Sequence, residues 1–204
     1  MIRHARAPRI VATSLFLAAL ASAVTTCSEF VGPAELTPAA LELVSGSGQS
    51  GTVAQALPNP LVVKVVDAAG TPVPDVAVLW TVTTGGGTVS AAAATTDAAG
   101  LNSAVWTLGT LAGTGTVTAS LPASSGIAPV TFTAPALAGP PAQLIFTAEP
   151  TSATAGVAMS PPVAVAVRDA SGNLVTTASG TVTLVLTTPG AATLTGGAAA
   201  TVTS

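Results

Sequence analysis

The sequence predicts an all-β protein whose strands pack as a β-sandwich, and three observations support this fold class. Thr, Val and Ala dominate the 204-residue chain, and Thr and Val favour strands. The 20 Gly and 16 Pro residues divide the chain into short segments, as in sandwiches with many turns. Apolar residues alternate with period two in several segments, whereas no segment keeps a helical period. With 49% hydrophobic and only 6% charged residues, the chain has enough apolar surface to fill a core.

The first predicted domain covers residues 38–134. Turns of the form Asp-x-x-Gly stand at Asp67–Gly70 and Asp97–Gly100, where glycine supplies a positive φ. Two strands place large apolar side chains on one face, at every second position: Val76, Val78, Trp80 and Val82, then Ala104, Trp106 and Leu108. In chain order, strands are expected at Leu41–Ser45, Thr52–Ala54, Leu61–Val66, Val76–Thr83, Gly87–Ser90, Ala94–Thr96, Leu101–Leu108, Thr114–Ser120 and Val130–Ala134.

Residues 1–23 have the pattern of a signal peptide. Three arginines lie in the first nine residues, and the apolar stretch Ile10–Ala23 ends in a small-x-small cleavage signal, Ala21-Ser22-Ala23. This stretch is shorter than the about 20 residues that a membrane-spanning helix needs. We therefore expect export to the outer membrane, the cell surface or the extracellular space. The alternative is an N-terminal anchor that is never cleaved.

Cys27 is the only cysteine, so no intrachain disulfide can form. It lies in the predicted tether 24–37, and its position resembles that of the lipidated cysteine of bacterial lipoproteins. Thr26 departs from the lipoprotein pattern, which has Gly, Ala or Ser there. Two alternatives stay open: lipid attachment at Cys27, or a free thiol after cleavage at Ala23. An acyl chain would anchor the protein through its buried CH₂ groups.

Cleavage after residue 23 would also remove His4 and three of the five basic residues. Lys64 and Arg168 would then stand against all eight acidic residues. Such a chain lacks the basic surface that binds the phosphates of nucleic acids or anionic membranes. We expect no nucleic-acid partner, and membrane contact only through an N-terminal lipid or an uncleaved anchor.

The residues that carry chemistry are few. Without His4 the chain has no histidine for a catalytic triad or a metal site, and we predict no catalytic, cofactor-binding or metal-binding residue. Asp67, Asp75 and Asp97 are interpreted as turn residues rather than catalytic carboxylates or calcium ligands. The run Gly85–Gly87 precedes no helix, so it predicts a hairpin loop and not a phosphate-binding loop.

Trp80 and Trp106 allow two interpretations, because exposed aromatic side chains can stack on sugars whereas inward ones fill a core. Both lie on the inward phase of alternating strands, which favours the core. Lys64 lies on the opposite phase from Val63 and Val65. A solvated lysine is therefore favoured over an isopeptide crosslink to Asp or Asn.

The segments Asp67–Gly87, Thr95–Gly109 and Ala112–Ala119 resemble the bacterial immunoglobulin-like domain of the invasin and intimin type, called Big-1. They match that family's two turn motifs, its Val-x-Val-x-aromatic strand and its penultimate strand, in order. The resemblance covers residues 38–134. It implies an immunoglobulin-like sandwich that is used in series as a rigid stalk on exported bacterial surface proteins. Such domains present adhesive or other modules and usually have no catalytic activity of their own.

After a predicted linker at 135–141, the pattern begins again in residues 142–204. The segment Pro161–Val175 repeats Leu61–Val73, with Asp169-x-x-Gly172 in place of Asp67-x-x-Gly70. Residues 182–188 correspond to the strand of Trp80, but no second Asp-x-x-Gly strand pair follows. We therefore expect two tandem immunoglobulin-like repeats, the second incomplete, in a fragment of a longer protein.

These observations favour a non-enzymatic structural or adhesin-type stalk module of an exported surface protein, without a cofactor. The alternative is a polysaccharide- or ligand-binding accessory module of a larger secreted protein. The expected partner is a protein or glycan at the cell surface, and its identity cannot be derived from the residues.

Overall fold

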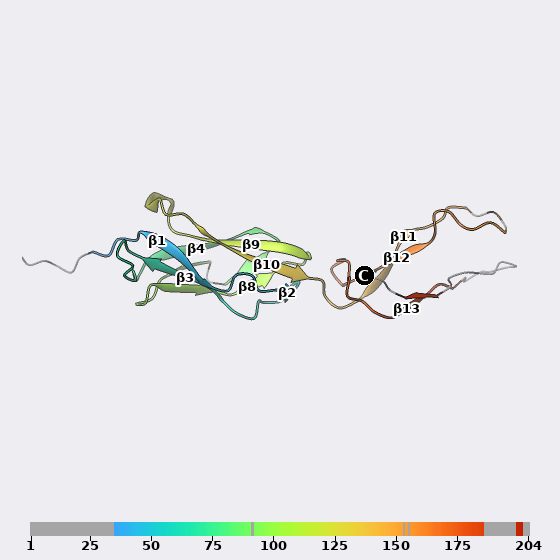
Figure 1. Cartoon of the computed structure of the whole chain (residues 1–204), viewed down its shortest axis with the longest axis horizontal. Coiled ribbons are helices and arrows are strands. Elements are labelled where there is room, and N and C mark those ends of the chain that lie inside the picture. Colours follow the sequence, from blue (N-terminus) through green and yellow to red (C-terminus); the bar gives the residue numbers. More distant parts are fainter. Residues whose placement is uncertain (1–34, 91, 153, 155, 186–198, 202–204) are drawn as a thin grey trace, which may run out of the picture. The chain divides into compact units, whose positions relative to one another are not determined.

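The computed structural model describes residues 35–90, 92–152, 154, 156–185 and 199–201 (Figure 1). All strands of this described part lie in one unit, Leu36–Ser204. The described residues contain no α-helix, and their one helical turn is the 3₁₀ turn Ala123–Ser125. The protein is all-β, as the sequence predicts. The predicted signal peptide 1–23 and Cys27 lie outside the described residues.

Two sheets make up the N-terminal domain. The first has three antiparallel strands in the order β1-β3-β7: β1 is Ala40–Ser45, β3 is Leu61–Val66 and β7 is Leu101–Ala104. The second has five strands in the order β2-β10-β9-β4-β6, of which β2 and β10 are parallel: β2 is Gly51–Thr52, β4 Ala77–Thr84, β6 Ala93–Thr95, β9 Gly113–Ser120 and β10 Val130–Leu137.

The core lies between these sheets. Alternate residues of β3, β4, β9 and β10 are buried, because successive side chains of a strand point to opposite faces. On β3 these are Leu61, Val63 and Val65, and they join Trp80 of β4 and Phe132 of β10 in one cluster. The domain is an immunoglobulin-like β-sandwich with a continuous apolar core.

The expected strand Leu101–Leu108 is interrupted at Val105. The backbone of Val105 bonds to Ser90 on both sides: its N–H donates to Ser90 Oγ at 2.9 Å, and its C=O accepts from Ser90 N at 2.9 Å. Beyond this point the chain changes partner, so that β8 (Trp106–Leu108) pairs with β5 (Gly87–Val89). The hydroxyl of Ser90 takes the place of a ladder bond, and a sequence pattern of period two does not show this change.

Two further segments differ from the sequence-based expectation. Strand β10 continues to Leu137, so residues 135–137 of the predicted linker are paired, with Pro135 opposite Thr114. Gly85–Gly87 does not close a hairpin, because β4 pairs with β6 and β9 whereas β5 pairs with β8. The expectation of a hairpin loop was wrong: these glycines carry the chain from one ladder to another.

The C-terminal segment contains two strand pairs. Strand β11 (Gln143–Ala148) pairs with β12 (Ala164–Arg168), and β13 (Thr181–Thr183) pairs with β14 (Ala199–Thr201). The register of β11 on β12 matches that of β1 on β3, since Leu144 opposes Val167 as Leu41 opposes Val65. The pairing register also shifts at the same place in both pairs, between Leu43 and Ser45 on β1 and between Phe146 and Ala148 on β11. Residues 186–188 of the strand expected at 182–188 lie outside the described residues.

Candidate functional site

Trp80 is a core residue. It is 3% exposed, and its indole N–H donates to Asn102 Oδ1 at 2.8 Å. Its ring packs at a tilt of 46° against Phe132, with centroids 5.4 Å apart. No face of the indole is free to stack on a sugar.

Trp106 is buried even more completely, at 0% exposure. A Cβ on Gly115 would lie 2.8 Å from its Cζ2 atom, so the missing side chain of Gly115 makes the space for the ring. The indole N–H of Trp106 has no hydrogen-bond partner in the described part of the protein. Both tryptophans therefore fill the sandwich, as the period of their strands predicts.

Asp67 and Asp97 shape turns. In each turn Oδ1 of the aspartate accepts two backbone N–H groups, from Ala69 and Thr71 in the first and from Ala99 and Leu101 in the second, at 2.7–2.9 Å. This is the bonding that an aspartate offers to a turn. Asp75 is exposed, with a φ of 59°, and its N–H donates to Thr96 O at 2.9 Å, next to Asp97. Oδ1 of Asp67 and Oδ1 of Asp97 are thus each bound within their own turn, and the three aspartates do not form a metal-binding group in the described part of the chain.

Lys64 is half-buried on β3, on the phase opposite to Val63 and Val65. Its cross-strand neighbours are Glu42 on β1 and Leu101 on β7. Neither is the Asp or Asn that an isopeptide bond would require.

Within the described residues, no group of three or more His, Cys, Asp or Glu side chains lies close enough to hold a metal ion. A helix that could cross a membrane is also not found among them. Cys27, the predicted site of lipid attachment, lies outside this part of the chain.

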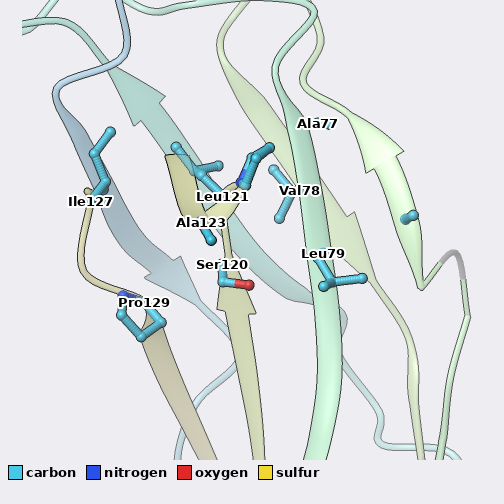
Figure 2. A pocket seen from close by; sticks show the side chains of 10 residues that line it. Ala77, Val78, Leu79, Ser120, Leu121, Ala123, Ile127 and Pro129 are labelled. Carbon is cyan, nitrogen blue, oxygen red and sulfur yellow. The ribbon is translucent and has the colours of Figure 1, made fainter. Parts of the chain in front are cut away.

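A shallow pocket of about 460 Å³ lies beside strands β4 and β9 (Figure 2). Leu79 and Ser120 line it from neighbouring strands, and Leu121, Ile127 and Pro129 line it from the segment after β9. Its other lining residues are also apolar: Ala77, Val78, Ala93, Pro122 and Ala123. Because Ser120 contributes the one polar side chain and no charge faces the space, the pocket offers no acid, base or nucleophile pair.

Asp169 has the most strongly bound carboxylate of the described residues. It is 2% exposed, and Oδ1 accepts from the N–H groups of Ser171 and Asn173 at 2.9 and 2.8 Å. Oδ2 accepts from Asn173 Nδ2 and from the N–H of Gly139, both at 2.8 Å. The Asn173 side chain and then the backbone N–H groups lower the pKa of Asp169 to about 2, against the opposing effect of desolvation.

Sequence reasoning missed the buried polar residues Asn102 and Thr96. Asn102 is 5% exposed and Thr96 2%; the hydroxyl of Thr96 donates to Val73 O at 2.8 Å and accepts from Val76 N at 3.0 Å. A signal for Asn102 exists, because it lies two residues before Ala104 and therefore on the same inward phase. No such signal marks Thr96, which follows the end of β6.

Residues 56–134 match the family model of the bacterial Ig-like domain (group 1). Among solved structures, the D00-D0 domain of intimin is 17% identical, covers 48% of this chain and 47% of its own, and gives a TM-score of 0.36. FdeC, an Escherichia coli adhesin, is 18% identical over 68% of this chain and 43% of its own, with a TM-score of 0.44. Domains 5-6 of the S-layer protein SbsC are 21% identical over 76% of both chains, with a TM-score of 0.35. The chain covers about half the length of the intimin structures that it matches, and no curated protein sequence matches it.

Proposed function

We propose that the protein is a structural stalk module of an exported surface protein, because residues 56–134 match the family model of the bacterial Ig-like domain (group 1). One observation carries the proposal: the aromatic and acidic side chains that could form a binding or catalytic site have structural roles instead. Trp80 and Trp106 are buried, and Asp67 and Asp97 bind the backbone of their own turns. What the domain offers is a stiff sandwich rather than a reactive site.

The C-terminal segment supports a module built of tandem repeats. The turn Asp169–Asn173 repeats the backbone bonds of Asp67–Thr71, and Val175 N–H donates to Val167 O as Val73 N–H donates to Val65 O. The same register on β11 and β12 as on β1 and β3 adds to this correspondence. Repetition of one unit along a chain is how elongated proteins gain length.

The alternative, a polysaccharide-binding accessory module, has less support. We expect such a module to present a row of exposed aromatic side chains, on which sugars can stack. Of the aromatic residues in the described part, Trp80, Trp106 and Phe132 are buried, which leaves Phe146 at 52% exposure. One exposed ring makes no row for a sugar chain.

Cell fractionation with protease shaving of intact cells tests the proposal. We expect the protein in the envelope or the medium, and its digestion by protease added to intact cells, while a cytoplasmic marker protein stays intact. Protein found only in the cytoplasm would contradict the proposal.

Attachment to a membrane is tested separately at Cys27. If Cys27 is lipidated, wild-type protein partitions into the detergent phase and its Cys27→Ser variant into the aqueous phase. Equal aqueous partitioning of both, with a mass that begins after Ala23, supports the secreted form. Detergent-phase partitioning of both supports the uncleaved anchor.

A further inference from the structure

Three turns of the described chain share the sequence Asp-x-x-Gly and the same internal bonds. In each, the aspartate N–H donates to the carbonyl of the fifth residue, and the glycine N–H donates to the aspartate carbonyl. In each, Oδ1 of the aspartate also accepts the N–H groups of the third and fifth residues. The turns therefore serve as internal controls for one another.

The third turn, Asp169–Asn173, differs at its fifth residue. Thr71 and Leu101 occupy this position in the first two turns, whereas the third has Asn173. The Asn173 amide reaches the N-terminal domain: its Oδ1 accepts from Ala112 N–H at 2.8 Å, and its Nδ2 donates to Thr110 O at 2.8 Å. The bonded atoms belong to the loop 109–112, which joins β8 to β9.

Three further hydrogen bonds hold the same turn. Asp169 Oδ2 accepts from the N–H of Gly139, just before β11, and Gln143 Nε2 donates to Asp169 O at 3.1 Å. Arg168 Nη1 donates to Gly172 O at 2.6 Å. None of these three contacts has a counterpart among the side-chain bonds of the described residues at the turns of Asp67 and Asp97.

We propose that the turn Asp169–Asn173 is a docking element with which an immunoglobulin-like repeat binds the loop 109–112 of the domain before it, through the amide of Asn173. The partner surface is thus the backbone of a preceding repeat. The meaning of this contact for a stalk rests on the proposed function, but the contact itself is a property of the purified chain.

An asparagine suits this site because its side-chain amide can donate and accept hydrogen bonds at once. Its amide holds one acceptor and two donor hydrogens in a plane, and the loop offers a donor at Ala112 and an acceptor at Thr110. A threonine hydroxyl has one donor hydrogen, so it cannot donate to Thr110 O and Asp169 Oδ2 together. An aspartate would place a charged acceptor against the Thr110 carbonyl. Because only backbone atoms are bonded, the side chain of Leu111 between them, 68% exposed, is free to vary.

Hydrogen exchange of single amides in the full chain, followed by NMR, tests the contact. In wild type we expect Ala112 N–H to be protected. In Asn173→Thr we expect it to exchange about fivefold faster or more, because the threonine oxygen lies one bond closer to the backbone than Asn173 Oδ1 and does not reach Ala112 N–H. Thr71→Ala, the matched change at the fifth position of the first turn, should leave Ala112 unchanged. Equal exchange of Ala112 in wild type and Asn173→Thr, with Ser171 N–H still protected by Asp169, would overturn the proposal.

If Asn173→Thr also exposes Ser171 N–H, the turn itself has opened. A variant on the loop side of the contact, Ala112→Pro, then tests the proposal. Ala112→Pro deletes the donor without changing the turn. With Cys27→Ser and spin labels at Thr131→Cys and Thr181→Cys, we expect this variant to broaden the distance distribution between the two labels. An unchanged width in Ala112→Pro would overturn the proposal. Cytoplasmic location of the protein would instead remove the stalk function and leave this contact standing.

Discussion

The indole N–H of Trp80 donates to Oδ1 of Asn102 at 2.8 Å, inside the sandwich. Trp80 belongs to β4 of the five-stranded sheet and Asn102 to β7 of the three-stranded sheet. The amide of Asn102 also donates to Thr95 O, at 3.0 Å, on β6. One buried side chain therefore ties three strands of both sheets by hydrogen bonds that the surrounding apolar core strengthens.

The variant Asn102→Leu should destabilise the domain. It leaves the Trp80 N–H and the Thr95 carbonyl without this partner, and a buried unsatisfied group costs roughly 1–3 kcal/mol. Urea unfolding measures the change in the free energy of unfolding. The neighbouring Ser103→Ala, at an exposed position, should stay within about 0.5 kcal/mol of wild type. Equal stability of both variants would contradict a structural role for this amide.

The fluorescence of the two tryptophans should show that both side chains are shielded from water. Trp80 and Trp106 are the only tryptophans of the chain, and both are buried. We therefore expect fluorescence emission at short wavelength with little quenching by acrylamide, and no change when soluble polysaccharides are added. Unfolding in urea provides the control, because it should make both side chains accessible to the quencher. Strong quenching of the folded protein would contradict the burial and reopen the sugar-binding alternative.

The fold could be predicted because its signals are local. Period-two alternation puts Val63, Val65 and Trp80 inside, and Asp-x-x-Gly encodes its turns through bonds within five residues. The break at Val105 could not be predicted, because it depends on Ser90, a residue fifteen positions away that bonds both backbone atoms of Val105. Period two describes the faces of a strand but not its partner.

Among the candidate site residues, too, only the roles that depend on local sequence could be predicted. The burial of Trp80 and Trp106 follows from strand phase, and the role of Asp67 from its turn. The role of Asn173 does not, since the same Asp-x-x-Gly pattern precedes Thr71, whose side chain has no hydrogen bond among the described residues. What distinguishes Asn173 is the loop at Thr110 and Ala112, more than 60 residues earlier in the chain, and a sequence pattern contains no information on that proximity.

The stability of the C-terminal segment should fall in acid. The hydrogen bond from Asn173, followed by backbone N–H groups, lowers the pKa of Asp169 from 3.8 to about 2. Since the folded-state pKa lies below the unfolded value, the carboxylate contributes stability above about pH 4, and that contribution is lost as the pH falls toward 2. NMR titration of the Asp169 carboxyl carbon should give a midpoint near 2, and thermal melts of Asp169→Asn should lose part of the acid dependence. A midpoint near 3.8 would contradict these bonds.

Gly115 and Trp106 should be energetically coupled. A Cβ at position 115 would lie 2.8 Å from Cζ2 and 3.0 Å from Cη2 of the buried indole, so Gly115→Ala overpacks the core and should cost about 1–3 kcal/mol. In a Trp106→Phe background those two ring atoms are absent, and the added methyl group partly fills the space they leave. The double mutant should then be more stable than the two single costs predict, with a coupling of roughly 0.5 kcal/mol or more in urea unfolding. Thr114→Ala, at the exposed neighbouring position, serves as the control. Additive costs would show that the loss at Gly115 comes from backbone freedom rather than from contact with the indole.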